Sequence, residues 1–248
     1  MNSFKIACLS IALAASLCAC ENDDDRTIDT SNIVGVWVNT HKDGQEVPTD
    51  ARFVSVYNAN LTEMYAIRGS DNHWKETSGY TYTIGGDTIA IAGNGTQLQY
   101  DLQELSDSTL EYRVSRLVIG GQDLQDSSVY TMRKASVNYS TQLIGTWEGH
   151  ETTDGIQGDT HRWKYNVDGT YQYSHAQVNG QWPNKTDNAG LYFLYGDYFI
   201  SNYRNDAETG IAGNACEAWV LSIDGDTMNL TALRNNKTHS FTMTRVAP

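Results

Sequence analysis

Proline, cysteine, positive charge and long hydrophobic runs are all scarce in this 248-residue chain. Its three prolines leave long stretches free to form continuous β-ladders. Lysine and arginine number 17 against 30 aspartates and glutamates, which gives a formal net charge of −13. Nucleic-acid binding needs cations that contact phosphate, so this composition argues against a nucleic-acid partner. The longest apolar run, 6–17, is shorter than the roughly 20 residues that a membrane-spanning helix needs.

The apolar run has instead the length and position of a signal-peptide core. It follows Lys5 and ends in the sequence Leu17-Cys18-Ala19-Cys20. This ending resembles the lipobox of bacterial lipoproteins, in which the cysteine becomes the new N-terminus and carries the lipid. The resemblance implies a signal peptide over 1–19 and acyl chains such as palmitate on Cys20, which would hold the protein on a membrane.

Acidic residues follow the lipobox directly. The segment Glu21-Asn22-Asp23-Asp24-Asp25 repels itself and stays solvated, so we expect a lipidated tether over 20–30 rather than part of a fold. The segment also resembles the acidic export signal of Bacteroidota lipoproteins, which implies an outer-membrane anchor and exposure at the cell surface. A plain spacer without an address function is the alternative.

Cysteine usage excludes a disulfide scaffold. Four cysteines are encoded, but Cys8 and Cys18 leave with the signal peptide and Cys20 is acylated. Cys216 then has no partner within the chain, so the fold must rest on its hydrophobic core. We interpret Cys216 as a buried small hydrophobic residue, with a catalytic thiol as the alternative.

The mature chain contains two copies of one sequence pattern. Ile33-Val34-Gly35-Val36-Trp37 recurs 110 residues later as Leu143-Ile144-Gly145-Thr146-Trp147, and Gly86-Asp87 recurs as Gly196-Asp197. The stretch 129–133 recurs as 240–244. These repeats predict two tandem domains, 31–135 and 141–247, each large enough to fold alone. The link between them is short, so we expect the two domains to touch.

Within each copy the hydrophobic pattern has a period of two. Segments such as 53–57, 80–84 and 170–173 are rich in β-branched and aromatic residues, and Asp-Gly pairs punctuate the chain at Asp43-Gly44 and Asp154-Gly155. We therefore predict an all-β fold of about eight hairpin-connected strands per copy. The expected architecture is two tandem up-and-down antiparallel barrels.

The Gly-x-Trp at the head of each copy resembles the start of lipocalins and other calycins. The nearest resemblance is to the lipocalin-like lipoproteins of Bacteroidota. It implies a short turn that closes the barrel floor, Gly35 and Gly145 at a tight bend, and the Trp37 and Trp147 indoles as floor plugs. It also implies a covering arginine, Arg133 over Trp37 and Arg245 over Trp147, each worth about 0.5–1 kcal/mol as a cation–π pair.

Catalytic motifs are absent from the sequence. We find no nucleophile elbow, phosphate-binding loop, dinucleotide fingerprint or His-Glu-x-x-His, and we predict no enzyme activity, cofactor or metal. His150, His161 and His175 have the composition of a three-histidine zinc site, but they lack tight ligand spacing and have no counterparts in the first copy. A hydrolase or metal-dependent enzyme is therefore the least favoured alternative.

Aromatic residues are the one surplus. Trp74 and Trp182 occupy matching places in the two copies, each in a polar sequence context. An indole in a polar loop can stack on a sugar or another planar ligand at a barrel mouth, and a lid residue that folds back on its own barrel is the alternative. Tyr171, Tyr173 and His175 share one face by alternation and complete the set of predicted ligand-binding residues.

These observations predict a membrane-anchored, non-catalytic module for ligand binding or protein assembly. Its predicted partners are the membrane, a small hydrophobic or glycan ligand, and an outer-membrane protein. An accessory glycan-binding lipoprotein of an outer-membrane uptake system is the alternative.

Overall fold

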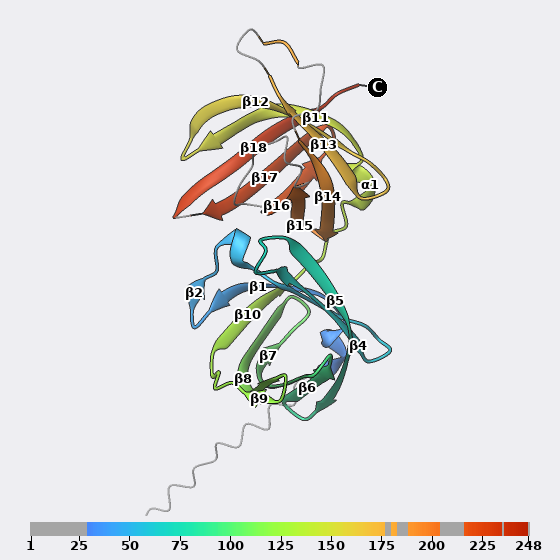
Figure 1. Ribbon diagram of the computed structural model, residues 1–248, viewed down its shortest axis with the longest axis vertical. Helices are drawn as coiled ribbons and strands as arrows, with labels where there is room; N and C mark the ends of the chain where they lie inside the picture. The colour runs from blue at the N-terminus through green and yellow to red at the C-terminus, as the bar shows by residue number, and fades with distance from the viewer. Residues whose placement is uncertain (1–28, 177–179, 183–187, 204–215, 235, 248) are drawn as a thin grey trace, which may run out of the picture.

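A computed structural model describes residues 29–176, 180–182, 188–203, 216–234 and 236–247. The predicted signal peptide, Cys20 and most of the acidic tether lie outside the described residues. The chain forms two closed antiparallel barrels in tandem, which confirms the predicted fold class. Figure 1 shows them stacked along the long axis of the molecule. Among the described residues, no helix has the length and apolarity needed to span a membrane.

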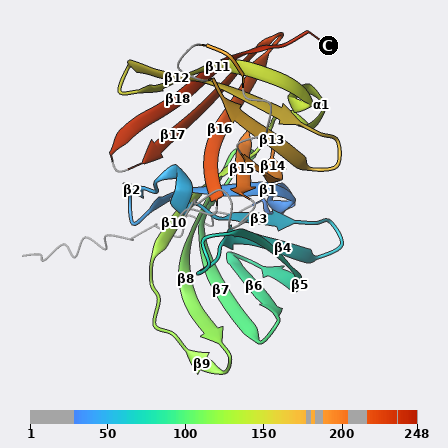
Figure 2. The ribbon, with the colours of Figure 1, turned by 45° about the horizontal axis from the view of Figure 1, so that its top comes forward.

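Barrel 1 is closed by eight strands in the order β1-β3-β4-β5-β6-β7-β8-β10, with β10 paired back to β1. Two-residue strands, β2 and β9, extend the hairpins at one end, and Figure 2 shows β4 to β8 side by side. The elements are η1 (Thr30–Ile33), β1 (Gly35–Lys42), β2 (Gln45–Glu46), η2 (Thr49–Ala51), β3 (Val54–Tyr57), β4 (Thr62–Arg68), β5 (Trp74–Gly85), β6 (Thr88–Gly93), β7 (Thr96–Leu105), β8 (Thr109–Ile119), β9 (Gln122–Asp123) and β10 (Val129–Lys134).

Barrel 2 repeats the plan with strictly sequential neighbours from β11 to β18, and β18 pairs back to β11. A single helical turn, α1, precedes it as η1 precedes barrel 1. The elements are α1 (Ser140–Leu143), β11 (Gly145–Thr153), β12 (Ile156–Tyr165), β13 (Thr170–His175), β14 (Asn188–Tyr195), β15 (Tyr198–Tyr203), β16 (Cys216–Asp224), β17 (Thr227–Arg234) and β18 (Lys237–Arg245).

The predicted Asp-Gly turns are confirmed. Asp43 and Gly44 have φ angles of 51° and 74°, and Asp154 and Gly155 have φ angles of 49° and 82°. Positive φ at both central residues gives the turn whose twist matches that of the flanking strands, and aspartate and glycine are among the residues that tolerate it. The local sequence therefore determines where β1 and β11 end.

The two barrel floors are built alike. The Trp37 indole donates a 2.7 Å hydrogen bond to the Ile33 carbonyl, and Trp147 donates a 2.8 Å bond to the Leu143 carbonyl. Both indoles are fully buried. Each bond ties a core side chain to the short turn that precedes its barrel, so the indole also fixes the angle at which the chain enters the first strand.

The cation over the floor differs between the barrels. Arg245 lies over the Trp147 ring at 4.2 Å, as predicted. The prediction for Arg133 is wrong, because Lys134 lies over Trp37, at 5.1 Å. Successive side chains on a strand point to opposite faces, so the neighbouring residue takes the role. Arg133 points outward and pairs with Asp197 of barrel 2 at 3.0 Å.

The glycine of each Gly-x-Trp makes room for this cation. Gly35 and Gly145 have φ angles of 143° and 130°. A Cβ at Gly35 would lie 2.5 Å from the Lys134 side chain, and one at Gly145 would lie 2.7 Å from Arg245. Glycine is therefore favoured here chiefly because the backbone conformation disfavours other residues, and a side chain would in addition push the covering cation aside.

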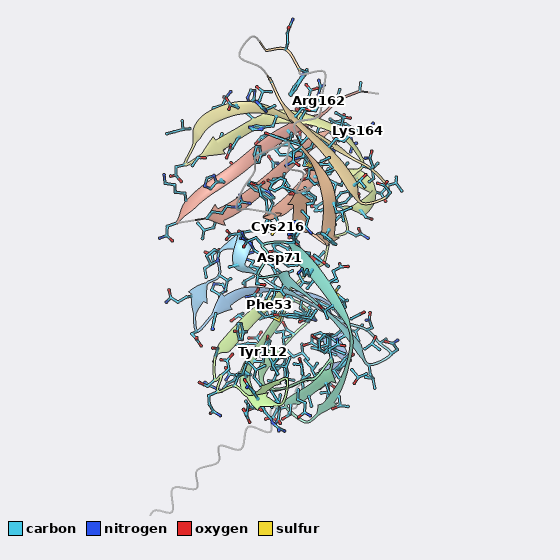
Figure 3. The ribbon with its side chains drawn as sticks, viewed as in Figure 1. Phe53, Asp71, Tyr112, Arg162, Lys164 and Cys216 are labelled. Carbon is cyan, nitrogen blue, oxygen red and sulfur yellow. The ribbon has the colours of Figure 1, made fainter. Side chains whose placement is uncertain are left out.

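The barrels touch through an apolar layer between their outer faces, which we call the inter-barrel cluster. Its buried members are Val38, Val54, Ala66 and Trp74 from barrel 1 and Tyr195, Tyr198, Ile200, Cys216 and Ala218 from barrel 2. Cys216 is labelled at this junction in Figure 3. The prediction that Cys216 is buried is confirmed, and burial raises the pKa of its thiol to about 11.

Hydrogen bonds from barrel 2 hold the start of β5. The Asn202 side chain accepts a 2.8 Å bond from the Trp74 backbone N–H and donates a 3.0 Å bond to the Trp74 carbonyl. The Trp74 indole donates to the Tyr195 hydroxyl at 2.9 Å, and that hydroxyl donates to Glu76. Nearby, Tyr198 donates to the Thr49 carbonyl at 2.8 Å. The junction is therefore both apolar and specifically hydrogen-bonded.

Candidate functional site

A cavity of about 270 Å³ opens inside barrel 1 and extends from Glu63, near the floor, toward the open end of the barrel. Phe53 and Tyr112, labelled in Figure 3, are two of its lining residues. Its described lining comes mainly from β4, β5, β7, β8 and β10 and consists of Phe53, Glu63, Tyr65, Tyr80, Thr96, Leu98, Tyr100, Tyr112, Val114, Leu117, Ile119, Asp126 and Tyr130. The cavity therefore lies in the interior of the barrel.

Aromatic rings form a continuous band along the cavity wall. Tyr65 contacts Phe53 at 5.3 Å between ring centroids, and Phe53 contacts Tyr130 at 5.6 Å. Tyr130 stacks on Tyr112 at 5.7 Å, and Tyr112 stacks on Tyr100 at 4.2 Å. These residues come from five different elements or their edges, so the band exists only once the barrel has closed. It offers a ligand several ring faces and edges at once.

Glu63 is the one acid buried within this cavity, among the described residues. It is 4% exposed and stands on β4 opposite Tyr80 of β5. Burial raises the pKa of Glu63 to about 7, against the opposing effect of the neighbouring Ser55 and Tyr57 hydroxyls. A carboxyl group with this pKa changes its charge near neutral pH, and buried ionisable groups of this kind are typical of functional sites.

A second cavity, of about 280 Å³, lies at the corresponding end of barrel 2. Its described lining is Glu151, His161, Trp163, Tyr173, Asn188, Tyr203, Glu217, Trp219, Arg234 and Phe241. Unlike the first, this cavity contains positive and negative side chains together. Some of its polar groups have partners within the barrel wall, whereas His161 Nε2 and Arg234 Nε are buried without a hydrogen-bond partner among the described residues.

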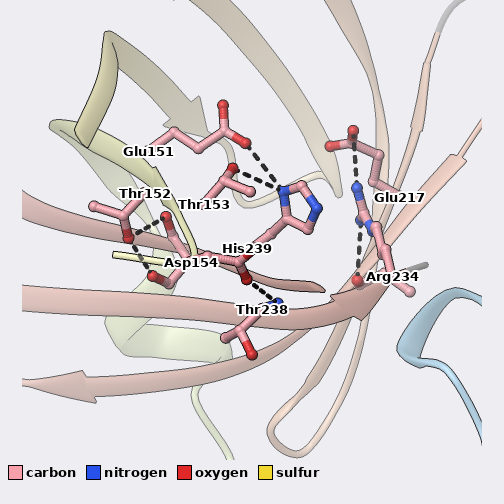
Figure 4. A network of polar contacts seen from close by, with 10 residues as sticks. Glu151, Thr152, Thr153, Asp154, Glu217, Arg234, Thr238 and His239 are labelled. Carbon is pink, nitrogen blue, oxygen red and sulfur yellow. Dashed lines mark hydrogen bonds and ion pairs between the residues drawn. The ribbon is translucent and has the colours of Figure 1, made fainter. Parts of the chain in front are cut away.

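Figure 4 shows the polar network around this second cavity. The Arg234 guanidinium pairs with Glu217 at 3.3 Å and lies over the Trp219 ring at 4.3 Å. On the neighbouring strands, His239 contacts Glu151 at 3.4 Å. Glu217 is thus matched by the Arg234 cation within the same barrel, and a charged ligand that binds either residue would have to displace this pair.

His161 is the buried histidine of the predicted zinc alternative. Its Nδ1 lies 2.7 Å from the Tyr173 hydroxyl, and burial lowers its pKa against the opposing effect of nearby acids such as Glu151. His175 is its cross-strand neighbour, whereas His150 is exposed and contacts Thr160. Among the described residues no group of three histidine, cysteine, aspartate or glutamate side chains is placed to hold a metal ion.

The predicted ligand-binding residues of β13 lie at different depths in barrel 2. Tyr171 is fully buried in the core, Tyr173 is partly buried and lines the cavity, and His175 is exposed at the rim. The alternation that placed them on one face thus corresponds to the interior face. Tyr173 borders the 280 Å³ cavity and Tyr171 lines a separate hollow of about 490 Å³, and the roles of all three residues in binding stay predictions.

The two matching tryptophans have different surroundings. Trp74 begins β5 and is 3% exposed within the inter-barrel cluster, so neither ring face is open to solvent. Trp182 is partly exposed and lies against Arg162, with the guanidinium 4.0 Å from the ring centroid. Figure 3 shows Arg162 on the side of barrel 2 away from barrel 1. The neighbouring segments 177–179 and 183–187 lie outside the described residues.

Sequence reasoning missed the cavity of barrel 1. Its rings stand on separate strands, and nothing in the local sequence joins Tyr65, Tyr100, Tyr112 and Tyr130. One signal was present: Glu63 interrupts the alternating segment Thr62-Glu63-Met64-Tyr65 at an inward position. An acid on the buried face of a predicted strand marks a special position, because buried charges are rare unless they are paired.

Comparisons with known proteins give only distant structural similarities. The sequence matches no protein-family model and no curated protein. Similar solved structures include a double mutant of transferrin binding protein B from Haemophilus parasuis Hp5, at 8% identity and a TM-score of 0.26, covering 79% of this chain and 54% of that one. Another is the isotype 1 transferrin binding protein B from serogroup B Neisseria meningitidis, at 7% identity and a TM-score of 0.26. That match covers 82% of this chain and 66% of the other. Such low scores carry no argument about function.

Proposed function

We propose that this chain is a membrane-anchored, lipocalin-like lipoprotein and a non-catalytic binding module, and that barrel 1 takes up a small ligand in its interior. The anchor on Cys20 rests on the sequence, and so does its place at the outer membrane with the barrels facing outward. The ligand site rests on the cavity of barrel 1.

The observation that carries the proposal is the lining of that cavity. Binding sites for small molecules are concave and mostly apolar, with a few polar groups that orient the ligand. The barrel 1 cavity has this composition, because tyrosine, phenylalanine and aliphatic side chains surround the single buried carboxyl group of Glu63. Its volume of about 270 Å³ is near the lower limit of ligand pockets, so a small ligand fits best.

Barrel 2 is the weaker candidate because charged side chains in its cavity, Arg234 and Glu217, already pair with each other. Displacing Arg234 from Glu217, or Tyr173 from His161, would leave a buried polar group without its partner. That loss costs about 1–3 kcal/mol for each group. The described lining of the barrel 1 cavity contains no ion pair, so a ligand can enter without breaking one.

A neutral fluorescent probe tests this proposal. N-phenyl-1-naphthylamine is titrated into the full chain and into the variants Leu98→Trp and Leu117→Trp, which each fill the cavity from one of the paired strands β7 and β8. We expect saturable fluorescence enhancement with the unsubstituted chain and its loss in both variants. Leu191→Trp adds the same side chain at an exposed position of barrel 2 and is the control. Unchanged binding in both filled variants would refute the site.

A further inference from the structure

We infer that the barrel 1 cavity selects an organic cation, an ammonium group on a small apolar or aromatic body, with Glu63 as its counter-ion. The inference rests on the proposed function, because it names the ligand class for the same cavity.

The charge of the lining is the first argument. Its described residues include two acids, Glu63 and Asp126, and no lysine, arginine or histidine. A buried carboxylate is costly unless a cation compensates it. In barrel 2 the chain supplies that cation itself, since Arg234 pairs with Glu217. In barrel 1 the described lining supplies none, and an ammonium ligand would complete the pair.

The aromatic band is the second argument. Ring faces attract cations, and a cavity walled by several rings binds an alkylated ammonium group by cation–π attraction and apolar contact together. The rim of the barrel already shows this chemistry, because the Lys42 ammonium group lies 5.5 Å from the centre of the Tyr130 ring. The Tyr130 ring also belongs to the cavity lining.

The position of Glu63 gives the ligand an orientation. Glu63 stands near the start of β4, next to the floor, whereas Leu117, Ile119 and Asp126 lie toward the open end. A ligand that places its ammonium group against Glu63 therefore leaves its apolar body among the rings. An anionic ligand would meet only repulsion in this lining.

Neighbouring groups leave Glu63 as the one titrating site near neutral pH. The ionisable side chains that act on it, or on which it acts, are tyrosines from four strands: Tyr57, Tyr65, Tyr82 and Tyr100. Burial raises the pKa of each of these tyrosines, so all four stay neutral through the physiological range. Charge in this part of the cavity is therefore set by Glu63.

The test compares a permanent cation with its neutral isostere. Phenyltrimethylammonium and tert-butylbenzene have the same shape, and the cation has no proton to lose, so a pH effect on its binding comes from the protein. Affinity of the full chain for each probe is measured by ligand-observed NMR titration at about pH 8.5 and about pH 6. We expect the cation to bind about tenfold or more tightly than the isostere at the higher pH. Cation affinity should fall about tenfold at the lower pH, where only a small fraction of Glu63 is ionised.

Substitutions then assign the effect to one carboxyl group. Glu63→Gln should lower cation affinity about tenfold or more at high pH, remove its pH dependence and leave tert-butylbenzene binding unchanged. Glu104→Gln removes the same charge from the exposed face of barrel 1 and should change neither probe. Asp126→Asn removes the other acid of the lining, so it distinguishes attraction of the cation by Asp126 at the rim from pairing of the cation with Glu63.

Each outcome bears on one claim. Equal affinity for the two probes at high pH, or cation binding that survives Glu63→Gln, would overturn the inference while leaving a ligand cavity in place. A cation effect that follows Asp126→Asn or Glu104→Gln instead would overturn the role of Glu63. If the unsubstituted chain fails to bind the neutral fluorescent probe, by contrast, the proposed function itself is wrong.

Discussion

The two barrels share one plan and differ in the side chains that line their cavities. Both have an indole plugging the floor under a cation, and both enclose similar volumes, about 270 and 280 Å³. Barrel 2 lines its cavity with charged side chains, of which Arg234 and Glu217 pair with each other. Barrel 1 surrounds Glu63 with tyrosines and leaves its charge unmatched. The fold therefore provides the space, and a few inward-pointing residues decide whether that space is available to a ligand.

The outer faces differ as well. Around the floor indole, barrel 1 has Val36 and Val38 where barrel 2 has Thr146 and Glu148. Val36 and Val38 point away from the interior and pack in or against the inter-barrel cluster, whereas Glu148 pairs with Arg162 on the surface of barrel 2. The apolar sequence around Trp37 thus follows from the contact between the two barrels.

The largest expected effect separates the two matching tryptophans. Trp74→Ala removes a buried side chain from the inter-barrel cluster and should lower the free energy of unfolding by about 3–5 kcal/mol. Trp182→Ala removes a partly exposed ring that contacts Arg162 and should cost at most about 1 kcal/mol. Urea unfolding followed by circular dichroism measures both. Equal losses would show that the cluster contributes little.

The next effect concerns Glu63 and pH. Its pKa in the folded chain is about 7, above the ordinary value of 4.5, so the folded state holds its proton more tightly than the unfolded state. Stability should therefore fall as pH rises from 4.5 to about 7, by about 3 kcal/mol for this group, and level off above that range.

Glu63→Gln should remove this pH-dependent loss of stability. The variant should match the unsubstituted chain at about pH 4.5 and be more stable than it by about 3 kcal/mol at about pH 8.5. Denaturant unfolding at several pH values is the measurement. Parallel stability curves for the two proteins would show that Glu63 is charged and well accommodated throughout.

A third prediction addresses the pairing in barrel 2. Arg234→Leu leaves the partly buried Glu217 without its cation and should cost about 2 kcal/mol, in the range of a charge-assisted hydrogen bond. The double variant with Glu217→Leu should recover most of that loss, because no buried charge is left unpaired. Thermal unfolding compares the single and double variants. A double variant as unstable as the sum of the single ones would argue against a preformed pair.

The smallest expected effect is at the floors. Lys134→Met and Arg245→Met remove the cations over Trp37 and Trp147, and each should cost about 0.5–1 kcal/mol for the lost cation–π contact. Arg245→Met should cost more, because Arg245 donates hydrogen bonds to two backbone carbonyls, those of Ile144 and Gln142, whereas Lys134 donates to one, that of Asn32. Differential scanning calorimetry on both variants gives the ranking, and the reverse order would contradict the assignment.

The sequence predicted the repeated all-β plan because these features are local. Asp-Gly turns, alternating strands and the Gly-x-Trp pattern each act within a few residues, and the duplication repeated the signal. The covering cation shows the limit of such reasoning. Arg133 and Lys134 are one residue apart, and one residue decides between the interior and the outer face.

The cavity could not be predicted from the sequence, for a different reason. Alternation reveals which residues share a face, but in β1 the consecutive residues Trp37, Val38 and Asn39 are all buried. Barrel 1 buries one side of this wall in its core and the other against barrel 2, so burial no longer distinguishes inside from outside. Placing Glu63 next to Tyr100 also needs the closed barrel, since these residues are far apart in sequence.

Strand β4 has one further property. Glu63 and Tyr65 point into the cavity, while Met64 and Ala66 pack in or against the inter-barrel cluster. A single layer of backbone is therefore the partition between two compartments, and neither compartment can be remodelled alone. A substitution that widens the cavity by shifting β4 also shifts the surface on which barrel 2 rests. Mutational tolerance along this strand is thus limited from both sides. The Cys216 thiol is buried in the same cluster, so a shift of β4 that opens the cluster would expose the thiol.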